Sequence, residues 1–212
     1  MRPTSMSRNR MGLSLKPGLT LYVARHGQTV ANVQKRFQGW SRDTALTPLG
    51  LTQAADIAAI LKRELADAPG IAMVASPLPR AKTTMEIVRA ALNLSPEDYA
   101  TDDRLKEINL GRWDGLTDAE AREQGPALFD ARSADKWHVR VPGGENYADV
   151  ASRVSGWIAQ LEQDSFAISH GATTRILRGL LAGLDWQAMS ALDEPQGVVF
   201  RIRGKEVVRL NP

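Results

Sequence analysis

The chain alternates between short apolar runs and longer segments whose apolar residues recur at helical spacing. The short runs predict buried strands at the start of the stretch 19–29 and over 71–75, 99–105 and 166–169. The longer segments predict helices over 48–66, 76–92, 145–163 and 172–184, with shorter helices within 117–132. Two of these helices have a start signal, because Thr47-Pro48 and Ser76-Pro77 each combine a capping residue with a proline.

Strands that alternate with helices favour parallel pairing, so the pattern predicts an α/β fold. Near the carboxyl end, the segments 197–203 and 206–210 alternate between apolar and polar residues on either side of Gly204-Lys205. Alternation around a short turn is typical of a hairpin, which we expect at an edge of the sheet.

Composition and length fit one folded domain. The 212 residues are 43% hydrophobic and 24% charged, which is ordinary for a globular protein of this size. We expect a single domain over 19–212, preceded by a disordered tail over 1–18 that is rich in Arg, Ser and Pro and has no apolar period.

Charge and cysteine content narrow the function classes. The net charge is +3 and the basic residues are scattered among acids, which argues against nucleic acid and suits small anionic substrates. The chain has no cysteine, which excludes disulfides and thiolate metal sites. No apolar run is long enough to span a membrane. We expect a cytoplasmic protein with a small-molecule substrate and without a metal or other cofactor. A homodimer is one possible oligomeric state.

Two of the predicted strands end in histidine followed by glycine. Arg25-His26 ends the first, and His170-Gly171 follows the fourth. In a parallel sheet both would lie at the carboxyl edge, where α/β folds bind ligands, and the helix after Gly171 would offer backbone donors to an anion. Our hypothesis is that neutral His26 attacks phosphorus while Arg25 holds the phosphate. A surface loop and a buried structural histidine are the alternatives.

Arg80 lies in the first turn of the helix predicted from Ser76, where the helix dipole disfavours a cation. A bound anion would compensate for that placement. An arginine that points into solvent explains it equally well.

The same residues belong to a longer series of motifs. They are Arg25-His26-Gly27-Gln28-Thr29 with Asn32, Phe37-Gln38-Gly39-Trp40, Leu46-Thr47-Pro48-Leu49-Gly50, Ser76-Pro77-Leu78-Pro79-Arg80-Ala81, Leu105-Lys106-Glu107 with Gly111, Trp113 and Gly115, Pro142-Gly143-Gly144-Glu145, and Ser169-His170-Gly171. With these motifs in this order, the chain from about Thr20 to Leu210 resembles the histidine phosphatase superfamily, in its phosphoglycerate-mutase-like branch 1. The resemblance implies three layers: an open, mostly parallel sheet flanked by helices, with an antiparallel edge strand.

The resemblance also implies roles for single residues. His26 looks like the nucleophile that becomes phosphohistidine, and Glu107 like the acid that protonates the leaving group. The phosphate pocket looks to be made by Arg25, Arg80 and His170, with further phosphate or substrate contacts from Asn32, Gln38 and Gly39. Chemistry alone requires an acid near His26 but leaves Asp103 and Asp114 as rivals to Glu107.

The activity that this resemblance implies is a phosphomonoesterase for a small phosphorylated metabolite, a phosphoric monoester hydrolase of the histidine acid phosphatase type. Mutase relatives usually carry a longer, arginine-bearing insertion before the Pro-Gly-Gly segment, whereas 117–141 is short here. A cofactor-dependent phosphoglycerate mutase is therefore the alternative, and a phosphoester-binding protein without catalysis is the second alternative. The candidates for a lid over the substrate are Arg132, Lys136, Trp137, His138 and Arg140.

Overall fold

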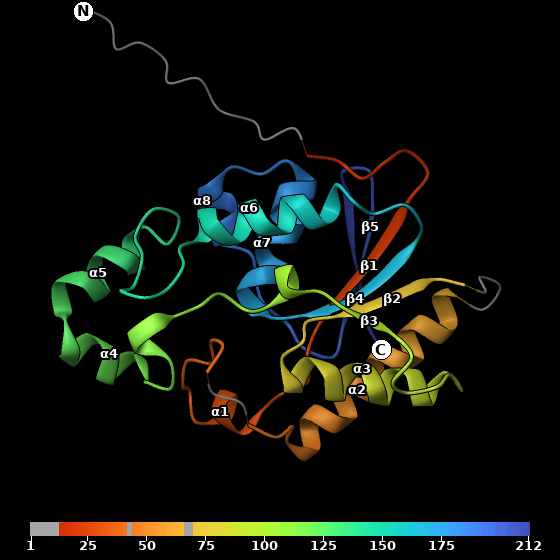
Figure 1. Ribbon diagram of the computed structural model, residues 1–212, viewed down its shortest axis with the longest axis horizontal. Helices are drawn as coiled ribbons and strands as arrows, with labels where there is room; N and C mark the ends of the chain where they lie inside the picture. The colour runs from red at the N-terminus through yellow and green to blue at the C-terminus, as the bar shows by residue number, and fades with distance from the viewer. Residues whose placement is uncertain (1–12, 42–43, 66–69) are drawn as a thin grey trace, which may run out of the picture.

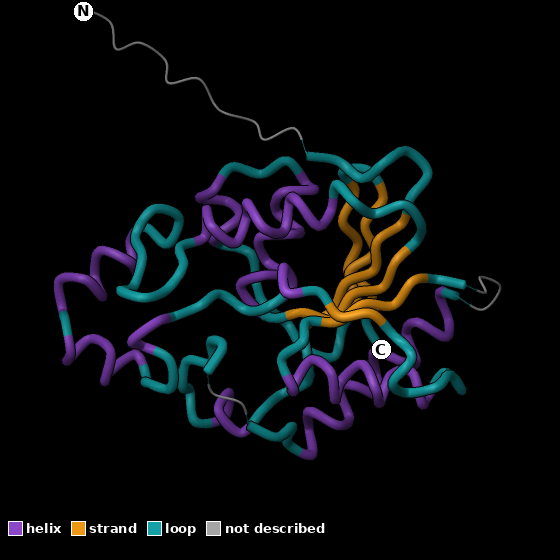
Figure 2. The backbone as a smooth tube through the Cα atoms, in the orientation of Figure 1, coloured by secondary structure: helices purple, strands orange, loops and turns teal. Residues whose placement is uncertain are grey.

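A computed structural model of the protein describes residues 13–41, 44–65 and 70–212, and a sheet of six strands forms its centre (Figures 1 and 2). The strand order is β3-β2-β4-β1-β5-β6. The strands span Thr20–Arg25 (β1), Ala72–Ala75 (β2), Ala100–Thr101 (β3), Ser165–Ser169 (β4), Val199–Arg203 (β5) and Glu206–Leu210 (β6). The first four pair in parallel, whereas β5 and β6 form an antiparallel hairpin at one edge. The prediction of a mostly parallel α/β sheet with an antiparallel edge is confirmed.

Helices cover both faces of the sheet. Helices α2 (Pro48–Glu64) and α3 (Pro79–Ala91) lie below it in Figure 1, and α6 (Tyr147–Ile158) and α7 (Gly171–Ala182) lie above it. Successive side chains of a strand point to opposite faces. Leu21 and Val23 of β1 therefore pack in one buried cluster with α6 and α7, while Tyr22 and Ala24 pack in another with α2 and α3. These two cores give the predicted three layers.

Four shorter helices lie at the rim of these layers. They are α1 (Val30–Val33), α4 (Asp118–Gln124), α5 (Pro126–Ala134) and α8 (Trp186–Ser190). Helices α4 and α5 project away from the sheet, at the left of Figure 1. Helix α8 has no counterpart in the prediction, because a single turn with only Met189 buried has no readable period.

Two predicted elements differ from the observed ones. The helix expected from Ser76 begins at Pro79, and its N-cap Leu78 makes no side-chain capping bond. The Ser76 hydroxyl instead lies 2.7 Å from the His170 ring. The strand expected over 99–105 is reduced to β3, because the chain then turns into the 3₁₀ segment Asp103–Leu105.

The disordered tail expected over 1–18 is also too long at its carboxyl end. Leu15 is buried in the core, and Leu13 packs against the same cluster. Residues 1–12 of that tail lie outside the described residues. Within the described ranges, no helix combines the length and the apolar character that a membrane span requires.

The register of the two central strands brings their ends together. Arg25 of β1 pairs with Ser169 of β4, and the His26 N–H donates to the Ser169 carbonyl at 3.0 Å. The next residue after each strand is a histidine, and α7 begins directly after the second one. The topology thus places both histidines at one edge of the sheet.

Candidate functional site

His26 and His170 lie edge to face at the carboxyl ends of β1 and β4. Their ring centroids are 5.1 Å apart and their planes meet at 61°. Both side chains are buried, and Arg80 approaches from α3 with its Nε 3.3 Å from His26 Nε2. Three of the residues that the sequence places far apart therefore meet at one point.

The ring of His26 is oriented by its own loop. Its Nδ1 lies 2.8 Å from the Gly27 carbonyl oxygen, to which it donates, so the lone pair is on Nε2. Burial in the first place, and then Arg80 and Arg25, hold the pKa of His26 well below its ordinary value. The ring is therefore neutral near neutral pH, which is the form that acts as a nucleophile.

Glycine is required beside this histidine. A Cβ atom on Gly27 would lie 2.3 Å from the Gly50 carbonyl oxygen, at the start of α2. This close approach of two backbones explains why both positions carry glycine and why the Thr47-Pro48 helix start lies beside the site.

His170 has one occupied and one open nitrogen. Its Nε2 is 2.7 Å from Ser76 Oγ, which itself accepts the Leu78 N–H. In the Nδ1–H tautomer, which we assign to this ring, Nε2 accepts the Ser76 hydroxyl proton. The buried Nδ1 has no hydrogen-bond partner within the described part of the chain. Burial, followed by Arg80, lowers the pKa of His170 well below its ordinary value. A neutral ring with a buried, unpaired Nδ1–H is suited to an anionic oxygen.

The two arginines are held from different sides. Arg80 donates to the carbonyl oxygens of Gln38 and Gly39 at 3.3 and 3.1 Å. Arg25 donates from Nη1 to the Glu194 carbonyl at 2.8 Å, while its buried Nε has no partner among the described residues. Backbone carbonyls thus help to position both guanidinium groups.

Glu107 lies at the amino end of α7. Its carboxylate accepts the N–H groups of Ile108 at 2.9 Å and of Ala172 and Thr173 at 3.3 Å each. Burial first, and then the charge of Glu194, raise the pKa of Glu107 above its ordinary value. A carboxyl group that stays protonated to higher pH is suited to act as a general acid.

The rival carboxylates face elsewhere. Asp103 pairs with Lys106 at 2.8 Å on the surface, and Asp114 accepts the N–H of Gly39 at 2.7 Å. Neither of them lines the cavity beside His26, whereas Glu107 does.

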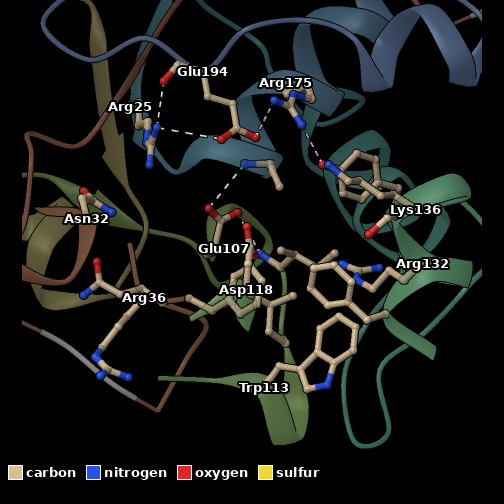
Figure 3. Close-up of a pocket in the computed structure, with 18 of the residues that line it drawn as sticks. Arg25, Asn32, Arg36, Glu107, Trp113, Asp118, Arg132, Lys136, Arg175 and Glu194 are labelled. Atoms are coloured by element: carbon tan, nitrogen blue, oxygen red, sulfur yellow. Dashed lines mark hydrogen bonds and ion pairs between the residues drawn. The ribbon is translucent and has the colours of Figure 1, made fainter. Parts of the chain in front are cut away.

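A cavity of about 410 Å³ opens in front of these groups (Figure 3). This volume suits a small metabolite. Of the predicted site residues, its lining includes Arg25, His26, Asn32, Gln38 and Glu107.

Four other predicted residues are not among those that line the cavity. They are Gly39, Arg80, His170 and Gly171. Each contacts a group of the site: Gly39 holds Arg80, Arg80 and His170 touch His26, and Gly171 lies against the Arg25 guanidinium.

The side chains of Asn32 and Gln38 are used within the protein. Asn32 Oδ1 accepts the Thr29 N–H at 3.1 Å in the capping box of α1. Gln38 is bonded to the hydroxyls of Thr29 and Thr44 at 2.6 and 3.2 Å. Both residues therefore shape the cavity wall, and Gln38 also positions Arg80 through its carbonyl oxygen.

The segment expected to form a lid contributes two of its five candidates to the cavity. Arg132 and Lys136 line it, on the side opposite Arg25 and Asn32 in Figure 3. His138 and Arg140 are exposed and pair with the acids Asp135 and Asp149. Trp137 packs against the hydrophobic core.

Several polar lining residues belong to no motif, among them Asp118, Tyr147, Arg175 and Glu194. Glu194 joins Arg25 and Arg175, and Arg175 donates to the Tyr147 hydroxyl at 2.9 Å. Glu194 stands in the loop after α8 without a motif, so no pattern in the sequence indicates it. The described residues include no group of three or more His, Asp or Glu side chains placed to hold a metal ion.

Comparison with known proteins identifies relatives of this arrangement. The model of the histidine phosphatase superfamily, branch 1, matches residues 21–207. Among curated proteins, the chain is 33% identical over 183 residues to the bifunctional protein Rv2228c of Mycobacterium tuberculosis, a match that covers 86% of this chain and 46% of that protein. The chain thus spans less than half the length of the first curated relatives that it matches.

Solved structures match over nearly their whole length. The α-ribazole phosphatase of Shigella flexneri superposes with a TM-score of 0.78 at 25% identity, covering 92% of this chain and 96% of that one. A mycobacterial glucosyl-3-phosphoglycerate phosphatase, solved in complex with VO3, superposes with a TM-score of 0.74 at 29% identity, covering 92% and 99%.

Proposed function

Because the chain belongs to the histidine phosphatase superfamily, branch 1, we propose that it hydrolyses small phosphorylated metabolites through a phosphohistidine on His26. The observation that carries this proposal is the meeting of His26 Nε2 with Arg80 Nε at 3.3 Å, beside a second buried imidazole. A neutral nucleophile beside fixed cations is suited to attack on the phosphorus atom of a phosphoester, because the cations stabilise its negatively charged oxygens.

In the first half-reaction, His26 Nε2 attacks the phosphorus atom and the ester P–O bond breaks. Arg25, Arg80 and the Nδ1–H of His170 stabilise the three equatorial oxygens. Glu107 gives its proton to the departing alkoxide, which leaves as an alcohol.

In the second half-reaction, water attacks the phosphorus atom of phosphohistidine and the N–P bond breaks. The Glu107 carboxylate accepts the proton of that water, inorganic phosphate leaves, and neutral His26 is restored. No cofactor enters either step, and the acid and the nucleophile both return to their starting forms.

The far end of the cavity supports a finer substrate class. Arg132 is buried and donates to the Val139 carbonyl at 2.9 Å, and Lys136 is half-buried. Neither forms an ion pair within the described residues, and burial lowers the pKa of both. Asp118 and Glu194 also line the cavity and act on Lys136 through their charge, but neither forms an ion pair with the two cations. Buried cations without a direct ion pair are costly unless a ligand supplies the charge. We call this pair the outer site, and propose that it binds a second anionic group of the substrate.

This reading fits a metabolite with a phosphoester at one end and a phosphate or carboxylate at the other. One of the similar structures is named as a phosphatase for glucosyl-3-phosphoglycerate, which is a substrate of this kind. We also propose the finer type predicted from the sequence, a histidine acid phosphatase-type monoester hydrolase. A cytoplasmic location and a homodimer remain predictions from the sequence.

Product analysis with 3-phosphoglycerate separates this function from the mutase alternative. A phosphatase releases inorganic phosphate and glycerate without forming 2-phosphoglycerate. Accumulation of 2-phosphoglycerate in the presence of a bisphosphoglycerate primer would instead favour the mutase. Lack of turnover on a broad panel of phosphoesters would favour a binding protein.

A further inference from the structure

The Glu194 carboxylate lies in the wall of the cavity between two arginines (Figure 3). It is 3.1 Å from Arg175 Nη2 and 3.9 Å from Arg25 Nη1. The mechanism above assigns Glu194 no step. The carboxylate neutralises Arg175. This arginine is therefore less available to bind an anionic ligand than Arg132 and Lys136 are.

Glu194 also borders the groups that act on the scissile bond. A Cβ atom on Gly171 would lie 2.6 Å from Glu194 Oε2, so this carboxylate rests against the first residue of α7. Glu107 accepts the N–H of the next residue, Ala172, at 3.3 Å. The two carboxylates are therefore neighbours, and the charge of Glu194 raises the pKa of Glu107. A leaving oxygen bound at Glu107 would therefore have its adjoining carbon atoms near Glu194.

The loop of Glu194 is held on both sides. Asp193 pairs with Arg178 and Arg209 at 3.3 and 3.1 Å. Gln196 Nε2 donates to the His26 carbonyl at 3.0 Å. The Glu194 carbonyl oxygen also accepts Arg25 Nη1 at 2.8 Å, so the position of Glu194 does not depend on the Asp193 side chain alone.

We propose that Glu194 is a specificity residue that rejects an anionic group beside the scissile ester and favours a neutral hydroxyl group there. The inference rests on the proposed function and refines its substrate class. A fixed carboxylate repels an anion and accepts a hydrogen bond from a hydroxyl. The substrate's second anion is thereby directed to the outer site, away from the ester.

A matched pair of phosphoesters tests this directly. Glycerol 2-phosphate and 2-phosphoglycerate differ only in that one hydroxymethyl group next to the ester carbon becomes a carboxylate. The measurement is phosphate release from each, expressed as the ratio of the two kcat/KM values. Where turnover of one compound is too slow, its inhibition constant against p-nitrophenyl phosphate takes the place of kcat/KM.

We expect Glu194→Gln to shift this ratio toward 2-phosphoglycerate by roughly tenfold or more, because one repulsive charge is removed and Arg175 is released. Effects on Glu107 acidity act on both secondary alcohols and cancel in the ratio. Glu194→Asp keeps the charge and should keep the parent ratio. This variant also provides a test if the Gln variant does not fold.

Asp193→Asn is the control for a general charge effect. It removes the same charge from the neighbouring position, which is exposed and outside the cavity lining. Its ratio should stay within about twofold of the parent. Arg178 remains held in that variant by the Thr174 and Asp193 carbonyl oxygens.

The outcomes separate the two proposals. A parent protein that turns over both compounds, with the same ratio in Glu194→Gln, overturns the role of Glu194 and leaves the phosphatase function standing. A parent protein that neither hydrolyses nor binds any phosphoester overturns the proposed function, and this inference with it.

Discussion

The two ends of the cavity are built in different ways. The inner site, which we define as Arg25, His26, Arg80 and His170, stands at strand ends and at the first turn of α3. The outer site, Arg132 and Lys136, stands at the end of α5 and just beyond it, away from the sheet. Strand register places Arg25, His26 and His170, whereas the outer pair depends on the course of α5 and of the loop after it. The inner site is therefore suited to the phosphoryl transfer itself, and the outer site to the choice of substrate.

Replacing the proposed nucleophile should have the largest effect. In His26→Ala, turnover should fall by roughly 10⁴-fold or more, because the variant loses the imidazole that lines the cavity and forms the N–P bond. Steady-state release of phosphate, with circular dichroism as a check on folding, measures this. A folded variant with activity within tenfold of the parent would remove His26 from the mechanism.

Changing the proposed acid should have a large effect that depends on the leaving group. In Glu107→Gln, hydrolysis of alkyl phosphates should fall by roughly 10²- to 10⁴-fold, because the alkoxide must leave without a proton. Hydrolysis of p-nitrophenyl phosphate should fall far less, since its phenolate leaves well unaided. Equal losses for both substrates would contradict the acid role.

Changes at the outer site should act on binding instead. Arg132→Ala and Lys136→Ala should each raise KM for a substrate with a second anion by roughly 10- to 100-fold, the usual range for a charge-assisted hydrogen bond. Values for p-nitrophenyl phosphate, which has no second anion, provide the control and should stay near those of the parent. A loss of kcat with both substrates would contradict the assignment of catalysis to the inner site and of substrate binding to the outer site.

The pH profiles of alkyl phosphates and p-nitrophenyl phosphate should differ by a smaller amount, because only groups at the reacting end of the cavity titrate. Activity should fall at low pH only when the lowered pKa of His26 is passed and the ring becomes charged. With alkyl phosphates it should fall again as pH rises through the raised pKa of Glu107, which then loses its proton. With p-nitrophenyl phosphate the alkaline fall should be absent, and its presence in kcat/KM profiles of both substrates would count against this assignment.

The inner site was largely predictable from the sequence because backbone geometry determines it. His26 and His170 each follow a strand, and parallel pairing then brings them together without any knowledge of side-chain direction. The capped proline at Pro48 and the glycines at 27 and 50 report local backbone needs, which short motifs record well. The structure brings the predicted residues together, while their roles remain proposals.

The remainder depended on information that short motifs do not carry. The carbonyl oxygens of Gln38 and Gly39 hold Arg80, which their motif does not indicate, and their contact with the substrate stays a prediction. Arg132 and His138 looked equivalent as lid candidates, yet one faces the cavity and the other pairs with Asp135 on the surface. Glu194 depends on the course of an irregular loop, which apolar periodicity does not encode.

The most direct test of the central claim is a rapid-quench experiment with a ³²P-labelled phosphoester. We expect acid-labile, alkali-stable label on the protein within the first turnover, at no more than one phosphoryl group per chain, and peptide mapping should place it on His26. The same experiment on His26→Ala should give none. Label on His170 or on a carboxylate, or turnover of the parent without any labelled protein, would contradict the account.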